Sequence, residues 1–373
     1  MQRSRVRWPL NSLLSAGGCA SRIAVDPSKH IDLVPGSRPQ HRVRADCSGL
    51  LAVFAITLLF SYAHPAWPQI SADQVKQVRA AVRNQIDTLL VFGGDFSFTG
   101  GTFTLTNELV PGQRVDAQAQ LRKFGGQGDI GYPRPVNGGY IAWQPHVQGS
   151  MGSIDWNNKP QSSLLMGDST QLKAEAIEFG GGGRFWLSNS VSIAPTLSGL
   201  YGHASDTYQA RSVFAVENIA LLRTLGLVDW HADAWALRPA VEVRYIAHVG
   251  GSLITLSIEP TYFHTHLFDY SNPHVAAGGN SGFVASTVDV DVPLAIQLAG
   301  RQLRTGGYLM RSDFLGDLRG GLGIEHVTEV HTRVVVDLLD HLWKVRWLGL
   351  GASYVWGKGL QGWTGGVDAA FQF

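Results

Sequence analysis

The stretch VDVDVPLAIQL, residues 288–298, decides the fold class because its side chains change character at every second position. Aliphatic residues occupy one face: Val288, Val290, Val292, Leu294, Ile296 and Leu298. The other face carries Asp289, Asp291, Pro293, Ala295 and Gln297. A period of two residues is typical of a β-strand with one apolar face, whereas a helix would repeat every three or four.

The same alternation recurs along most of the chain, separated by turn clusters such as NNKPQSS and GKGLQG. Segments of helix length do not alternate with these strands, which disfavours a βαβ architecture and predicts an all-β fold. About twelve strands are expected, near residues 91–98 or 101–107, then 113–122, 139–149, 171–180, 191–202, 238–248, 253–266, 284–298, 301–311, 322–336, 345–356 and 362–373. The stretch 204–236 is the least regular part of this pattern.

Alternation fits a soluble β-sandwich as well as a membrane barrel, so strand length has to separate the two. The expected strands run to about 10–13 residues, whereas strands of soluble proteins average about five or six. Crossing the hydrocarbon core at a tilt takes about 9–11 residues. Charged residues make up only 16% of the chain, and aromatic residues gather at strand ends. These features favour a transmembrane antiparallel β-barrel, with apolar side chains towards lipid and polar ones inside.

Residues 71–90 form the one clear helix of the sequence, ahead of the strands. Val75, Val78, Val82, Ile86 and Leu89 recur at steps of three and four and define one apolar stripe. Such a helix packs either on a soluble domain or, in a barrel, in or near the lumen. For a barrel of about twelve strands the interior is narrow, and we expect side chains or this helix to fill it.

Residues 1–63 read as a leader with the apolar core of a signal peptide at 49–63, flanked by Arg42 and Arg44. Residues 1–40 are best explained by a start site placed too far upstream; a lipoprotein signal ending at Cys19 is the alternative. Both cysteines, Cys19 and Cys47, fall in this leader, so disulfides are not expected to hold the exported part together. The leader holds eight of the 30 basic and three of the 29 acidic residues, which leaves a net charge of −4 and no electrostatic reason to expect nucleic acid as a partner.

The helix at 71–90 followed by LLVFGGDFSFTGGTFTL, the strand pattern of 91–373 and the terminal VDAAFQF together resemble the solitary autotransporter-like β-barrel family of bacterial outer membranes. The resemblance implies a translocator-type barrel without a passenger domain, open as a narrow pore or plugged, and not an enzyme. It also implies an outer-membrane location in a Gram-negative cell, contact with membrane lipid and lipopolysaccharide, and insertion by the barrel-assembly machinery. Phe371 and Phe373 resemble the sorting signal for that machinery, and no cofactor is implied.

Charged residues on the expected inward faces predict a network of ion pairs in the lumen, because desolvated charges need partners of opposite sign. On these grounds the network is expected to contain Glu259, Asp289, Asp291, Glu325, Glu329, His331, Arg333 and Asp337.

Two short motifs suggest other chemistry. His203 and Ser205 stand two apart in YGHASDT, so on a strand a histidine base would face the same side as a serine nucleophile, which supports the alternative of a barrel-embedded lipid hydrolase. His264 and His266, with His274 nearby, have the spacing of metal ligands, but their parity matches the apolar face and predicts an outward position without further ligands. GGGGR at 180–184 lacks the helix that a phosphate-binding loop requires.

Overall fold

Twelve antiparallel strands form a ring that closes where the first strand pairs with the last. The computed structural model describes residues 72–95, 101–110, 113–136, 141–160, 167–275, 278–338 and 345–371, all within one unit, Asp46–Phe373. The predicted leader and Phe373 lie outside the described residues. The strands of the ring are β1 (Gly101–Val110), β2 (Gln113–Asp129), β4 (Ile141–Pro160), β5 (Ser169–Trp186), β6 (Val191–Gln209), β7 (His231–Val249), β8 (Ser252–Tyr270), β9 (Gly278–Leu298), β10 (Arg301–Gly316), β11 (His326–Asp337), β12 (Val345–Gly357) and β13 (Leu360–Phe371).

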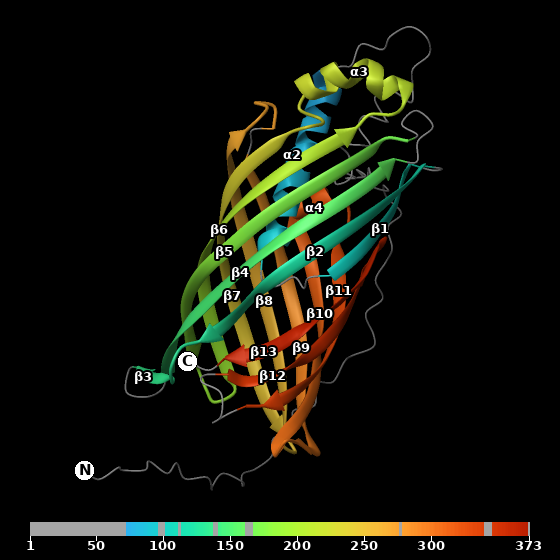
Figure 1. Cartoon of the computed structure of the whole chain (residues 1–373). Helices are drawn as coiled ribbons and strands as arrows, with labels where there is room; N and C mark the ends of the chain where they lie inside the picture. The colour runs from blue at the N-terminus through green and yellow to red at the C-terminus, as the bar shows by residue number, and fades with distance from the viewer. Residues whose placement is uncertain are drawn as a thin grey trace, which may run out of the picture. The chain divides into compact units, whose positions relative to one another are not determined.

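Each strand pairs with its neighbours in sequence, and β1 pairs with β13 to close the barrel (Figure 1). The short β3 (Arg134–Val136) pairs with β4, while β2 pairs directly with β4. Every expected strand is found, which confirms the predicted all-β barrel of about twelve strands. Of the two positions considered for the first strand, 101–107 is correct and 91–98 is wrong, because residues 91–94 continue the preceding helix.

The irregular stretch 204–236 contains no additional strand. It consists of the end of β6, the helix α3 (Val213–Thr224) and the start of β7. Ser212 caps α3 by accepting a hydrogen bond from the backbone N–H of Ala215. Together with α4 (Asp317–Leu322), α3 marks the end of the barrel opposite the end at which β13 finishes.

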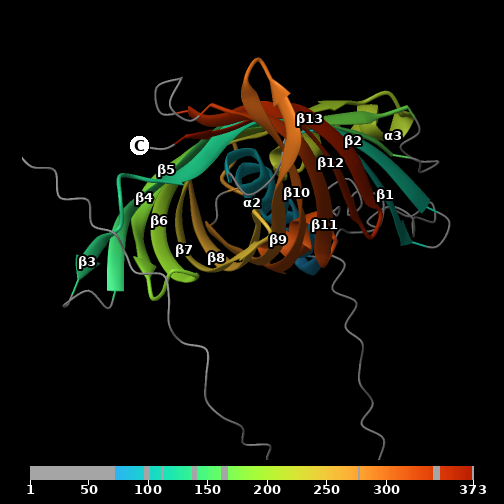
Figure 2. The ribbon, with the colours of Figure 1, turned by 90° about the horizontal axis from the view of Figure 1, so that it is seen from below.

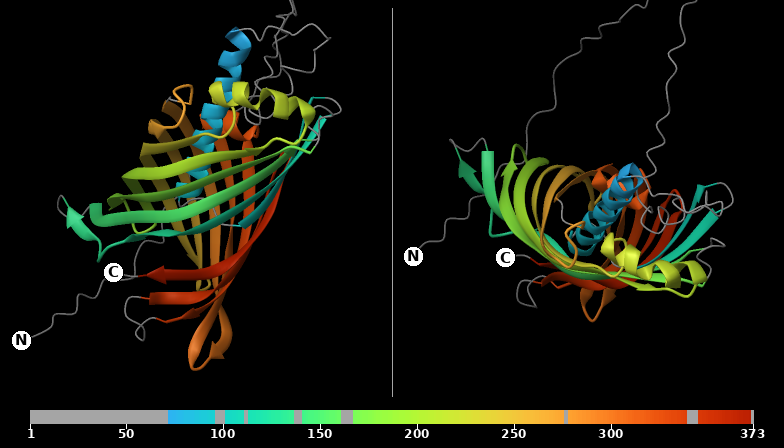
Figure 3. Two further views of the ribbon diagram at one scale, coloured as in Figure 1. Left: turned by 45° about the horizontal axis from the view of Figure 1, so that its top comes forward. Right: turned by 90° about the horizontal axis from the view of Figure 1, so that it is seen from above.

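The predicted helix at 71–90 is present as α2 (Ala72–Gly94) and lies inside the ring of strands (Figures 2 and 3). Its first residues are at the end of the barrel that carries α3 and α4. None of the helices among the described residues combines the length and hydropathy needed to cross a bilayer.

The inward and outward faces of the strands exchange character along the barrel. In the half nearer β13's last residue, apolar residues such as Leu237 and Val241 point outward and Arg238 and Glu242 point inward, as predicted for a membrane barrel. In the half around α2 the assignment of polar side chains to the interior is wrong. There Ala119 and Leu121 are buried inside, while Gln118, Gln120 and Arg122 face outward.

Candidate functional site: the filled lumen

The helix α2 fills the half of the lumen nearer α3 and α4. Val82, Ile86 and Leu89, three members of the apolar stripe predicted from sequence, are completely or almost completely buried. Leu90 and Val91 are also fully buried. Because α2 packs against α4 as well as against β4, β5 and β6, other faces of the helix are covered besides the stripe.

Small residues on the inner wall let the helix backbone come close to the strands. Ala174 and Ala176 on β5 and Ala204 on β6 are buried there. At Gly202 of β6, an added Cβ atom would lie 2.6 Å from Cδ2 of Leu90. Side chains of ordinary size at these positions would therefore push the helix away from the wall.

The C-terminal end of α2 is held by donors from the adjacent strands β2 and β4. The Lys123 ammonium on β2 donates to the carbonyl oxygen of Phe92, at 2.9 Å, and to that of Asp95. The Ser150 hydroxyl on β4 donates to the carbonyl oxygen of Gly94. The last carbonyl groups of a helix carry partial negative charge, so a cation at this point stabilises the helix end.

Arg238 on β7 joins this helix end to two further strands. Its Nε atom lies 2.5 Å from Oδ2 of Asp95 and 3.7 Å from Oε1 of Glu178 on β5, and its Nη2 atom lies 2.8 Å from Oε1 of Glu259 on β8. The side chains of Arg238, Asp95 and Glu178 are wholly inaccessible to solvent. We call Lys123, Asp95, Glu178, Arg238 and Glu259 the mid-lumen layer, which spans the interior directly beyond the helix.

Past this layer the lumen is lined by ion pairs. On one wall the Arg184 guanidinium lies 3.0 Å from Asp129 and 2.7 Å from Glu242. His146 contacts Asp129 at 2.7 Å, and Arg244 contacts Glu242 at 2.7 Å. Each buried charge on this wall thus has a partner of opposite sign, as its desolvation requires.

The facing wall, from β9 to β13, carries most of the residues predicted for the lumen. Arg333 forms a bidentate pair with Asp289 at 2.8 and 2.9 Å, and Arg304 lies 3.1 Å from Asp291. His331 contacts Asp368 at 3.1 Å. Two further contacts complete this wall: Tyr308 donates to Glu329 at 2.7 Å, and His331 contacts Ser353 at 2.7 Å.

Two predicted members, Asp337 and Glu325, lie at or just beyond the ends of β11. Asp337 is the last residue of β11, on the same face as Arg333 and Val335. Glu325 does not belong to the lumen: it precedes β11, its side chain is 69% exposed, and it pairs with Arg319 of α4 at the barrel end. The expectation failed because β11 begins at His326 and not near residue 322, so residue 325 precedes the strand and its side-chain direction cannot be read from the alternation.

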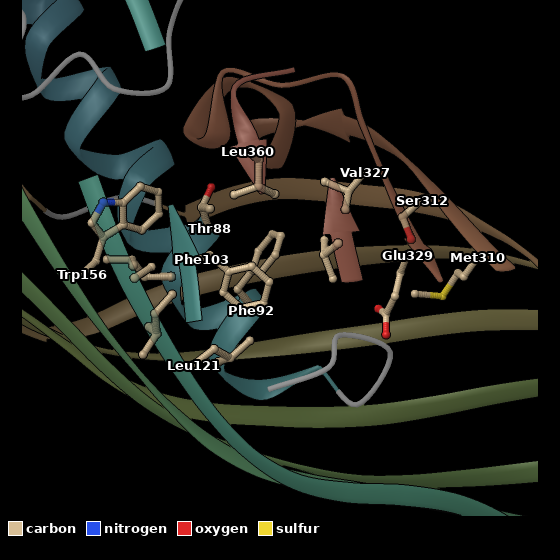
Figure 4. A pocket seen from close by; sticks show the side chains of 14 residues that line it. Thr88, Phe92, Phe103, Leu121, Trp156, Met310, Ser312, Val327, Glu329 and Leu360 are labelled. Carbon is tan, nitrogen blue, oxygen red and sulfur yellow. The ribbon is translucent and has the colours of Figure 1, made fainter. Parts of the chain in front are cut away.

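A polar cavity of about 380 Å³ lies between the two walls. Glu242, Arg244, Glu259, Asp289 and Tyr308 are among its lining residues. A much smaller apolar cavity of about 50 Å³ remains beside α2, between Phe92 and the strands that bear Phe103 and Trp156 (Figure 4). The helix therefore packs against the wall with little free volume, and the open space lies on the other side of the mid-lumen layer.

The residues proposed for other chemistry lie on the outer face. His203 Nδ1 contacts Asp233 Oδ1 at 2.5 Å, which supplies an orienting carboxylate that the sequence did not reveal. Within the described residues, His203 and Ser205 share no hydrogen bond. The imidazole of His264 contacts Asn280 at 3.0 Å, and His266 lies against Trp235, both outward as predicted.

The remaining candidates are His274, the GGGGR stretch and the two terminal phenylalanines. His274 lies in the connection between β8 and β9, and no three potential ligands among the described His, Cys, Asp and Glu residues are arranged to hold a metal ion. The GGGGR stretch is continuous strand within β5. Phe371 ends β13, but its side chain and Phe373 are outside the description, so their role in assembly stays a prediction.

The mid-lumen layer, apart from Glu259, was missed by sequence reasoning. A signal was present in Arg238, a charged residue that shares its inward face with Ala232, Ala234 and Ala236. A long cation at the end of such a run of small residues indicates a position where an inserted element stops and a polar layer begins.

Comparison with known proteins agrees with this geometry. Residues 132–364 match the family described as the solitary outer membrane autotransporter beta-barrel domain. Among solved structures, the transport unit of the autotransporter AIDA-I from Escherichia coli is similar, with 10% identity, a TM-score of 0.50, and 79% of this chain and 98% of that chain covered. The translocator domain of NalP from Neisseria meningitidis shows 13% identity and a TM-score of 0.40, with 82% of this chain and 100% of that chain covered. No curated protein matches the chain.

Proposed function

The chain belongs to the solitary outer membrane autotransporter β-barrel family and is an outer-membrane barrel of the translocator type, and on that premise we propose that α2 closes its lumen and that the mid-lumen layer holds the helix in place. The observation that carries the proposal is the position of the helix. It occupies the lumen with its first residues at the α3 end and its last residues fixed by Lys123, Ser150 and Arg238.

The direction of α2 supports a translocator-type arrangement. In this orientation the N-terminal end of α2 lies at the mouth that carries α3 and α4, opposite the end where β13 finishes. With β13 ending at the periplasmic side, that mouth faces the exterior. Export through a signal peptide at residues 49–63 and insertion by the barrel-assembly machinery complete the proposal and rest on the sequence features described above.

The hydrolase alternative is supported less well. A base has to lie within hydrogen-bond reach of the nucleophile that it activates. His203 contacts Asp233, but among the described residues it forms no hydrogen bond with Ser205. We therefore infer a non-enzymatic barrel as the function that the geometry supports best.

Single-channel recording tests the plug. We expect residues 64–373 in a planar bilayer to show little conductance. A variant lacking residues 64–90 is expected to conduct several-fold better, because the helix is gone while Asp95 and its ion pairs remain. Equal conductance of the two proteins would contradict the proposal.

A matched control is a variant that lacks residues 213–224, the α3 helix outside the lumen. Its conductance should equal that of residues 64–373. Electrophoretic migration without heating should first establish that all three proteins are folded barrels.

A further inference from the structure

The outer wall of β2, β4, β5, β6 and β7 changes from polar to apolar between two adjacent rows of residues. Strand register places Arg122, Ser153, Glu175, His203 and Asp233 side by side in one row across the five strands. These five side chains face outward, because the buried residues of their strands alternate with them.

The next row towards the periplasmic end consists of large apolar and aromatic residues. It contains Phe124, Met151, Ile177, Tyr201 and Trp235, again matched by strand register. All five are exposed, from 39% at Trp235 to 77% at Phe124. A contiguous band of exposed apolar side chains in a barrel wall marks contact with lipid.

The row on the other side confirms that the boundary is sharp. It contains only polar side chains: Gln120, Asp155, Lys173, Ser205 and His231. The edge of the hydrocarbon layer therefore lies between the Arg122 row and the Phe124 row. Head groups of the surrounding lipid are therefore expected beside Arg122 and Glu175.

A groove of about 620 Å³ crosses this boundary on the outer surface. It is lined by Arg122, Glu175 and His203 on the polar side and by Phe124 and Ile177 on the apolar side. Arg122 donates to Gln120 of its own strand at 3.4 Å, and neither Arg122 nor Glu175 forms an ion pair with a described residue. The groove thus offers a cation and a carboxylate beside an apolar surface.

We propose that this groove binds a phosphorylated glycolipid of the outer leaflet. The Arg122 guanidinium meets a phosphate, since arginine binds phosphate with paired N–H donors. The Glu175 carboxylate and the Ser153 hydroxyl accept hydrogen bonds from sugar hydroxyls. The acyl chains lie along Phe124 and Ile177 below.

Ser153 and Glu175, the acceptors beside Arg122, suit a head group that carries hydroxyl donors as well as a phosphate. Tyr201 and His203 both contact Asp233, at 3.3 and 2.5 Å, so that carboxylate is already engaged. Glu175 retains its acceptor capacity, which a sugar hydroxyl satisfies; the ammonium of phosphatidylethanolamine is the competing donor, and the comparison of the two lipids below decides between them. The inference depends on the outer-membrane placement and not on whether the lumen is plugged.

Binding of purified lipid A to the detergent-solubilised barrel, followed by native mass spectrometry, tests the proposal. We expect Arg122→Gln to weaken binding of diphosphorylated lipid A by roughly tenfold, the effect of one charge-assisted hydrogen bond. Removing both phosphates from lipid A should weaken binding to the wild type by a similar factor and to Arg122→Gln hardly at all. Arg311→Gln, an outward arginine paired with Asp313 on β10, is the matched control and should bind as the wild type does.

Three results would overturn the proposal. Equal binding by wild type and Arg122→Gln would show that the groove is not the site. Equal loss in Arg311→Gln would show unspecific attraction to positive charge. Phosphatidylethanolamine binding as tightly as lipid A would show that the groove selects no sugar.

Discussion

Arg238 lies wholly inside the barrel and neutralises carboxylates from three different elements, Asp95 beyond α2, Glu178 on β5 and Glu259 on β8. Arg238→Met keeps much of the volume and removes the charge. The acidic groups are then left facing one another in a desolvated layer. Removing one partner from a buried ion pair costs about 3–5 kcal/mol, so we expect the free energy of unfolding to fall by that amount in urea titrations of the barrel in vesicles.

The comparison variant is Arg311→Met, which removes an arginine whose pair with Asp313 is half exposed on the outer face. Exposed pairs contribute little to stability, and its urea midpoint should stay at the wild-type value. If both variants unfolded at the same urea concentration, the mid-lumen layer would have no special role in stability.

At the scale of single residues, the sequence predicted inward charges correctly in the half of the barrel beyond α2, as at Asp289, Asp291 and Arg333, but not in the half around the helix. It did not predict the partners of Arg238, because Asp95 is 143 residues away in the chain and lies after a helix. Parity gives the face of a side chain. The partner depends on how the helix and strands meet in the lumen.

At the scale of elements, β7 shows why alternation alone did not assign its faces. Near α3 its inward residues Ala234 and Ala236 pack in the helix-filled interior and Asp233 faces outward, as in a soluble sheet. Farther along, Val241 faces lipid and Glu242 faces the polar lumen. A strand of 19 residues is longer than the hydrocarbon layer is thick. Its apolar side chains therefore point inward in the half beside α2 and outward in the half beside lipid.

The fit of α2 against the wall leads to a prediction about Gly202 of β6. A Cβ atom there would lie 2.6 Å from Leu90 of the helix and 2.7 Å from the carbonyl oxygen of Glu175. Gly202→Val should therefore displace the helix and raise the single-channel conductance above that of the unmodified barrel. Gly199→Val on the same strand is the control, because nothing lies within 4 Å of its added Cβ atom. Unchanged conductance in Gly202→Val would show that the helix does not depend on this contact.

At the scale of the whole barrel, the sequence predicted the number of strands and the interior helix, but not how firmly each seam closes. Among the described residues, the seam between β1 and β13 runs over four residue pairs, from Thr102–Trp363 to Leu105–Leu360. The neighbouring seam between β12 and β13 runs over twelve. Seam length depends on where β1 starts relative to β13, which no single strand pattern contains.

Because backbone hydrogen bonds across a seam hold a barrel closed in the bilayer, we expect the barrel to open first between β1 and β13. A disulfide from Thr104→Cys with Gln361→Cys joins directly paired residues of this seam, and residues 64–373 contain no other cysteine to compete. The oxidised disulfide should raise the urea midpoint of unfolding, and its reduction should restore the original midpoint. Ala352→Cys with Gly365→Cys staples the longer β12–β13 seam and should raise the midpoint much less, since that seam opens later. Equal gains from the two staples would mean that the barrel unfolds without a preferred opening point.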